Sequence, residues 1–80
     1  MKTHLKLLEG VHLTQRQKQV IKHGLENGWQ LNQLWASPRI TFKLLEILGN
    51  GQYLVGEITN DRDIMNRPLI RKYKVQLITS

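Results

Sequence analysis

The chain has 80 residues, of which 40% are hydrophobic and 22% charged, and these proportions predict one small folded domain rather than a disordered polyelectrolyte. Twelve Lys and Arg residues against six Asp and Glu residues give a net charge of +6, which favours an acidic partner. The absence of cysteine excludes disulfides, thiolate nucleophiles and sulfur-ligated zinc sites, and it fits a reducing compartment. A domain of this size has a thin hydrophobic core, which argues against a deep catalytic cavity.

The sequence has no pattern typical of targeting or membrane insertion. Residues 1–8 are basic, but they lack the apolar core and the small-residue cleavage site of a signal peptide. No window approaches the ~18 uninterrupted apolar residues of a membrane span. We therefore expect a cytoplasmic protein with no membrane partner.

The first two predicted elements are a strand and a helix. Residues 4–7 alternate polar and apolar side chains, which predicts a short strand. Residues 15–27 place their apolar side chains on one helical arc, which predicts a helix. Thr14 is a suitable N-cap for that helix, and Gly28 can take the left-handed conformation that closes its other end.

The middle of the chain has two interpretations. Leu31, Leu34 and Trp35 follow at helical spacing and predict a short second helix, and Ser37-Pro38 is a start signal for a third helix that ends near Leu48. The alternative for residues 40–48 is a strand, because Ile40-Thr41-Phe42 has high strand propensity and Asn50-Gly51 suits a two-residue hairpin turn. That strand would have apolar residues on both sheet faces, so we favour the helix.

The C-terminal part predicts two strands, residues 52–59 and 70–78, joined by a long basic loop. The whole order predicts an α+β domain of the winged helix-turn-helix type, with a short N-terminal strand, three helices and a C-terminal two-stranded wing. The alternative fold is one helix packed on a three- to four-stranded antiparallel sheet.

Two short motifs add a family resemblance to this interpretation. Leu13-Thr14-Gln15-Arg16 and Ser37-Pro38-Arg39 resemble the opening of the helix-turn-helix and the start of the recognition helix in LuxR-type regulators. The resemblance covers roughly residues 13–48 and implies that the third helix enters the major groove of duplex DNA. The chain departs from those regulators in having only eight residues, 29–36, between Gly28 and Ser37.

The leading functional hypothesis is a small nucleic-acid-binding domain that acts on duplex DNA as a regulator or accessory factor, as a homodimer because one small module grips DNA weakly. Its third helix would contact bases, and its loop and last strand would contact phosphates. The candidate residues are Arg39, Thr41, Lys43, Arg62, Arg67, Arg71, Lys72 and Lys74.

Two other functions have support in the residues. The first is a protein-interaction module, such as an inhibitor or adaptor encoded by a phage or plasmid, which binds an acidic partner with Trp29 and Trp35 as anchors. The second is RNA binding by a basic sheet, in which Tyr53 and Tyr73 would stack on bases.

Catalytic and metal-binding patterns are weak. The three histidines lack ligand spacing, and Glu57, Asp61 and Asp63 are the clustered acids that could hold a divalent cation. An Asn-Asp-Arg-Asp sequence is more typical of a solvated turn. We therefore expect no enzymatic activity, no metal and no cofactor.

Overall fold

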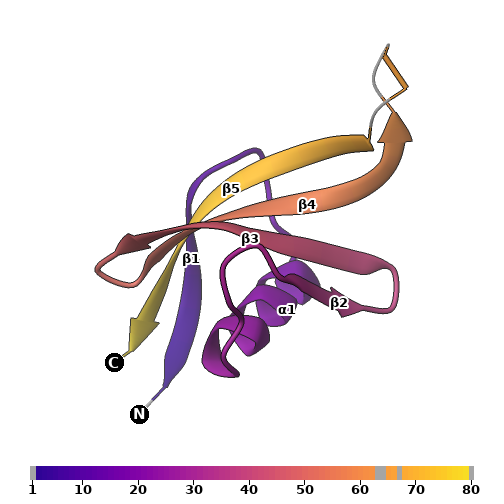
Figure 1. Cartoon of the computed structure of the whole chain (residues 1–80). Helices are drawn as coiled ribbons and strands as arrows, with labels where there is room; N and C mark the ends of the chain where they lie inside the picture. Colours follow the sequence, from indigo (N-terminus) through magenta and orange to yellow (C-terminus); the bar gives the residue numbers. More distant parts are fainter. Residues whose placement is uncertain (1, 63–64, 67, 80) are drawn as a thin grey trace.

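In the part of the chain that it describes, the structure, a computed structural model, is one helix on an antiparallel sheet of five strands (Figure 1). It describes residues 2–62, 65–66 and 68–79. The strands lie in the order β1-β5-β4-β3-β2, so the first and last strands of the chain are neighbours. The elements are β1 (Thr3–Glu9), α1 (Gln15–Glu26), β2 (Leu34–Ser37), β3 (Ile40–Gly49), β4 (Gln52–Arg62) and β5 (Pro68–Thr79).

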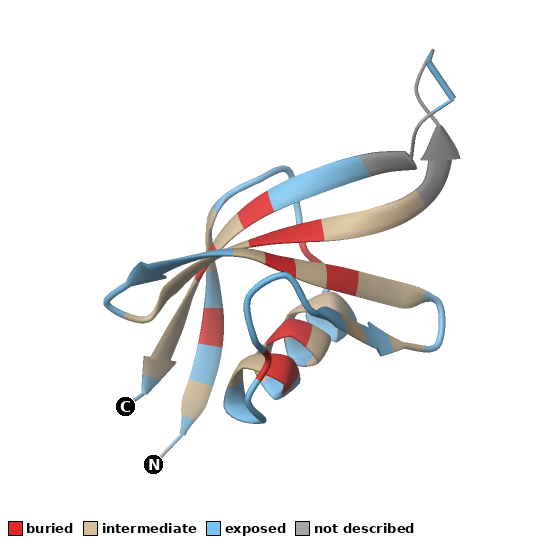
Figure 2. Cartoon of the chain, viewed as in Figure 1, coloured by how far each residue is buried: buried red, intermediate tan, exposed pale blue. Residues whose placement is uncertain are grey.

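Helix α1 lies against one face of the sheet and reaches both of its edges. It contacts β1 at one edge and β2 and β3 at the other, because the sheet curls around it (Figure 1). The core lies between the helix and this face, where the buried segments of both meet (Figure 2). Its members are Leu5, Leu13, Ile21, Trp29, Phe42, Leu44, Val55, Tyr73 and Val75.

The prediction of α1 is confirmed, including its N-cap. The Thr14 hydroxyl accepts a hydrogen bond from the Gln17 amide at 3.1 Å, and the Gln17 side chain accepts one from the Thr14 amide at 2.8 Å. This reciprocal capping box satisfies two backbone donors that a helix start leaves without partners. Ile21, at the centre of the predicted apolar arc, is fully buried.

The three predicted strands are confirmed as well. Residues 4–7 lie within β1, residues 52–59 within β4, and residues 70–78 within β5. Their alternation also gives the correct inward face, since Leu5 and Val75 belong to the core. Period-two patterns are reliable here because one face of each strand is covered by the helix and the other is not.

The winged helix-turn-helix prediction is wrong, because neither of its later helices forms: a turn followed by β2 replaces the second helix, and β3 replaces the third. Leu34 and Trp35 lie in β2, and the expected third helix is β3, Ile40–Gly49. No recognition helix exists within residues 34–49, so the resemblance to LuxR-type regulators does not extend to the fold. The alternative of one helix on an antiparallel sheet fits, with five strands rather than three or four.

Turn chemistry explains this outcome. Asn50 and Gly51 both have positive φ, 54° and 75°, as a type I′ hairpin turn requires, and they join β3 to β4. Ser37 pairs with Ile40, so Pro38 and Arg39 form a second two-residue turn. Proline at the first central position of a turn has the same fixed φ as at a helix start, and the Ser-Pro signal therefore fits both structures.

The objection to a strand at residues 40–48 fails because the outer face of the sheet has apolar contacts of its own. Gly56 of β4 has no side chain, and Ile70 and Leu45 pack over it on the outer face. A Cβ atom at this position would lie 2.7 Å from Ile70 and 3.0 Å from Leu45. Register irregularities in β3, between Leu44 and Glu46 and between Ile47 and Gly49, also shift the pairing. The outer face therefore tolerates apolar side chains without a covering layer.

Candidate functional site

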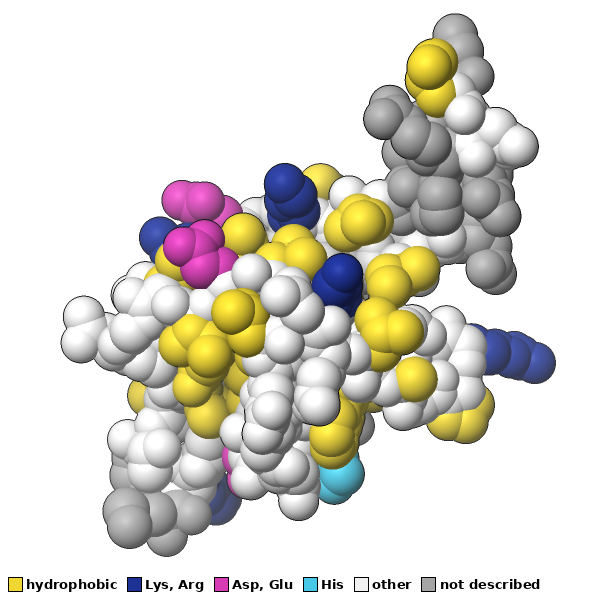
Figure 3. Space-filling view, viewed as in Figure 1, with side chains coloured by type: hydrophobic (Ala, Val, Ile, Leu, Met, Phe, Trp, Pro, Cys, Tyr) yellow, Lys and Arg dark blue, Asp and Glu magenta, His cyan; other side chains and the backbone are white. Residues whose placement is uncertain are grey.

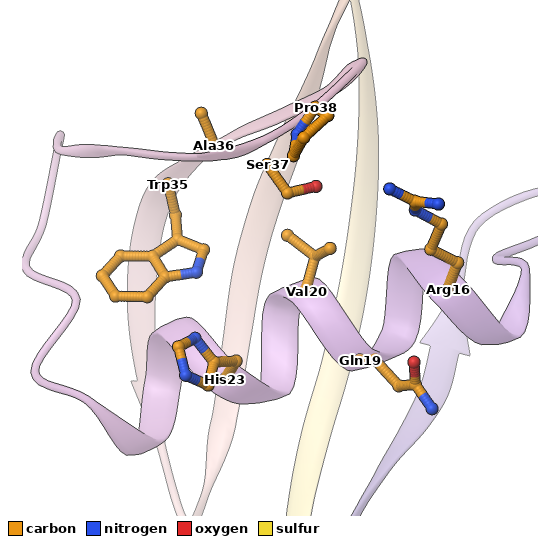
Figure 4. A pocket seen from close by; sticks show the side chains of 8 residues that line it. All are labelled: Arg16, Gln19, Val20, His23, Trp35, Ala36, Ser37 and Pro38. Carbon is orange, nitrogen blue, oxygen red and sulfur yellow. The ribbon is translucent and has the colours of Figure 1, made fainter.

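A hollow lies between α1 and β2, at the edge of the sheet (Figure 4). Its volume is about 570 Å³. The helix supplies one wall, and β2 with the turn after it supplies the other. The lining residues are Arg16, Gln19, Val20, His23, Trp35, Ala36, Ser37 and Pro38.

Local periodicity places these side chains. Arg16, Gln19, Val20 and His23 follow at i, i+3, i+4 and i+7, so they share one face of α1. On the opposite wall, Trp35 and Ser37 are two residues apart and point from β2 toward the helix (Figure 4). The hollow is thus formed by one helix face and one strand face.

Trp35 is the largest side chain of the hollow. It is half-buried, and its ring lies 5.6 Å from the His23 ring and 6.4 Å from the Trp29 ring, measured between centroids. The helix permits this close approach because residue 24 is glycine. A Cβ atom on Gly24 would lie 2.9 Å from Cγ of Trp35, so any larger residue would displace the indole.

The electrostatic character of the hollow is basic. Arg16 and His23 are exposed on its helix wall, and Asp and Glu are absent from its described lining. Lys18 and Lys22, on the neighbouring face of α1, line a smaller depression against β1 together with His4. The buried Ser37 hydroxyl oxygen has no hydrogen-bond partner among the described residues.

The outer face of the sheet brings together four of the predicted nucleic-acid residues, Thr41, Lys43, Lys72 and Lys74. Phe42 and Tyr73 face the helix, so their strand neighbours face outward. Lys43 and Lys72 lie on either side of Gly56 in one cross-strand row. Hydrophobic side chains with single Lys and Arg side chains among them are visible in the space-filling view (Figure 3).

The other predicted nucleic-acid residues lie elsewhere. Arg39 is exposed in the turn between β2 and β3. Arg71 pairs with Glu57 across β5 and β4, on the helix-covered face. Arg62 is the last residue of β4, and Arg67 lies outside the described residues. The predicted set therefore does not form one surface.

The aromatic candidates separate into core and surface residues. Trp29 is only 6% exposed, and its indole nitrogen donates to the Gln33 carbonyl at 2.7 Å, so it is a core residue. Tyr73 is 3% exposed, which rules out base stacking on its ring, and Tyr53 packs against the core on the same side. Trp35 lines the hollow between α1 and β2.

Glu57 has a structural role. Its carboxylate accepts hydrogen bonds from the Gln17 side chain at 3.1 Å and from the Tyr73 hydroxyl at 3.0 Å. Burial raises the pKa of Tyr73, and the neighbouring Glu57 carboxylate raises it further. Asp63 lies outside the described residues. Among the residues that the structure describes, no three His, Cys, Asp or Glu side chains are grouped to hold a metal ion.

Sequence reasoning missed Arg16, Gln19, Val20, His23 and Ser37. The helical spacing of the first four was a usable signal, because it puts a mixed basic and apolar strip on one face of a correctly predicted helix. This strip of the helix indicates a candidate site only when β2 is known to lie opposite it.

Comparisons with protein-family models, curated proteins and solved structures find no match to this chain. Within the described part of the chain, no helix has the length and apolar character needed to cross a membrane.

Proposed function

We propose that this chain is a protein-interaction module that binds an acidic segment of a partner protein in the hollow between α1 and β2. The observation that carries the proposal is the composition of that hollow, where a half-buried indole lies against His23 at one end, the exposed Arg16 side chain lies at the other end, and no acidic residue is part of the described lining (Figure 4). The lack of cysteine supports action in the cytoplasm.

The physical roles of the lining residues differ. Trp35 and Val20 offer apolar surface, and a buried aromatic anchor typically supplies much of the binding energy of an interface. Arg16 can hold a carboxylate through two parallel hydrogen bonds. The net charge of +6 accelerates encounter with an acidic partner and makes the association rate sensitive to salt.

The test is fluorescence anisotropy with a labelled library of nine-residue peptides that alternate Asp or Glu with apolar residues. We expect Trp35→Ala and Arg16→Gln each to weaken binding by about tenfold or more, as loss of a hot-spot residue does. Lys72→Gln is the matched control, since it removes the same charge from the outer face. Equal losses for Arg16→Gln and Lys72→Gln would show that net charge, and not the hollow, drives binding.

A second candidate function is nucleic-acid binding by the outer face of the sheet. Lys43 and Lys72 support it, because they stand in one row on either side of Gly56 and can contact successive phosphates. The test measures anisotropy of labelled duplex DNA and single-stranded RNA across a salt series. We expect the Lys43→Gln/Lys72→Gln variant to lose binding and Arg16→Gln to keep it; the reverse order would reject this surface.

A further inference from the structure

The free edge of β2 borders the hollow and determines how a bound segment can lie. Strand β2 pairs with β3 on one side, from Leu34 opposite Lys43 to Ser37 opposite Ile40. On its other side, the described part of the chain supplies no strand. An edge strand presents backbone N–H and C=O groups that can pair with another chain.

The hairpin geometry shows which backbone groups face outward. Ser37 and Ile40 flank a two-residue turn, and such flanking residues form a hydrogen-bonded pair. Alternation along the ladder then makes Trp35 the next residue bonded to β3. The Leu44 amide, two residues beyond the partner of Trp35, donates to the Gln33 carbonyl at 3.2 Å, which continues the same alternation. Leu34 and Ala36 therefore direct their N–H and C=O groups away from β3.

Ala36 connects this edge to the hollow. Its methyl group points away from α1, yet the residue lines the hollow, so its backbone forms part of the wall (Figure 4). A ligand in the hollow is thus adjacent to outward-facing backbone groups. The helix face from Arg16 to His23 rises about 10 Å, which is the length of about three residues of extended chain.

We propose that the acidic partner segment binds as an added strand along the edge of β2; this inference rests on the proposed function and specifies its mode. Side chains alternate in an added strand, so every second one enters the hollow. One acidic side chain lies at Arg16, and an apolar side chain two residues away lies against Trp35.

Charge favours this occupant over a second copy of the chain. Two copies that paired through their β2 edges would bring together two hollows that both contain Arg16 and His23. Each copy also carries a net charge of +6, so their association is opposed by repulsion. An acidic segment has the complementary charge and brings its own unpaired backbone groups.

The test compares two substitutions at one residue. Ala36→Pro removes the outward N–H and is compatible with an edge strand, whereas Ala36→Val changes the side chain and keeps the N–H. Using the peptides defined above, we expect Ala36→Pro to weaken binding about tenfold or more and Ala36→Val to change it by less than about threefold. Thermal unfolding of both variants verifies that the fold is kept.

Backbone N-methylation of the peptide provides a measurement that does not depend on the variant. Methylation at alternate positions of one parity should abolish binding, and methylation at the other parity should not. Wild-type affinity for Ala36→Pro together with equal effects at both parities would overturn strand addition, even if Trp35→Ala and Arg16→Gln still lose binding. A wild-type dimer that Ala36→Pro dissociates would also overturn it, because a second copy would then occupy the edge. Failure of the wild type to bind any peptide would instead reject the proposed function.

Discussion

Arg39 occupies a backbone conformation that glycine adopts far more easily than arginine. Its φ is 71°, and it follows Pro38 in the turn between β2 and β3, where a type II turn requires positive φ. The left-handed conformation costs a residue with a Cβ atom about 1 kcal/mol. We expect Arg39→Gly to raise the free energy of unfolding by about 1 kcal/mol and Arg39→Ala to leave it nearly unchanged. Urea denaturation measures both, and equal stability of the two variants would contradict this account of the turn.

Tyr73 makes the stability of the fold sensitive to alkaline pH. Burial, and then the hydrogen bond to Glu57 and the charge of that carboxylate, raise the pKa of Tyr73 above the ordinary value of 10.0. Between that value and the folded-state pKa, the unfolded chain releases the proton and the folded chain keeps it. The free energy of unfolding therefore falls as the pH rises above about 10.

The measurement for this prediction is urea unfolding of the wild type and of Tyr73→Phe at a series of pH values. Tyr73→Phe should lose stability near neutral pH, because Glu57 loses a donor, and should show a weaker decline above about pH 10. Tyr53→Phe is the matched control for the loss of a tyrosine hydroxyl. Parallel curves for wild type and Tyr73→Phe would mean that Tyr73 titrates normally.

Gly24 lowers the helical propensity of α1, but it allows the helix to pack closely against two indoles. Alanine at an exposed helix position is favoured over glycine by about 1 kcal/mol. At position 24, however, a Cβ atom would lie 2.9 Å from Trp35 and 3.0 Å from Trp29. Overpacking of this kind costs about 1–3 kcal/mol, so we expect Gly24→Ala to be destabilising overall. Calorimetry measures the melting temperature of the variant, and tryptophan fluorescence reports displacement of the two indole rings. A variant that is more stable than the wild type and has unchanged fluorescence would contradict the packing described.

Each element could be predicted from the sequence to the extent that its own residues determine it. Helix α1 carries its capping box and its apolar arc within 13 residues, Thr14–Glu26, and was predicted nearly to its ends. Strand β3 was not, because Ile40–Leu48 also forms a clean helical projection, and the choice depends on pairing with β4 and β2. Pairing irregularities placed Ile47 opposite Tyr53, where the simple hairpin predicts Leu54. The choice between helix and strand for residues 40–48 was therefore made by pairing with other strands, because the local sequence pattern fits both structures.

The candidate site could be predicted even less than the fold, because it is a property of the whole molecule. Arg16 and Ser37 face each other only because the sheet curls until β2 meets the helix (Figures 1 and 4). Trp35 was singled out from its residue type, and Trp29 with it, although Trp29 belongs to the core. Of the predicted nucleic-acid residues, four lie on the outer face of the sheet, whereas Arg39 and Arg71 lie on other surfaces. Composition predicts an acidic partner, whereas the position of the proposed binding site follows from the fold alone.

The two ends of the chain meet in the sheet, so the fold depends on its first strand. β1 pairs with β5 from Thr3 opposite Thr79 to Glu9 opposite Lys74, and α1 packs against it. Deletion of residues 1–9 would remove Leu5 from the core, expose the edge of β5 and leave one side of α1 uncovered. The lost burial and strand pairing are comparable with the whole stability of a small domain, about 5–15 kcal/mol. We therefore expect residues 10–80 to be unfolded at 25 °C by circular dichroism and amide proton dispersion, with Leu5→Ala destabilised by about 2–5 kcal/mol but folded. A fragment that melts cooperatively like the full chain would show instead that α1 and strands β2 to β5 form a complete core without β1.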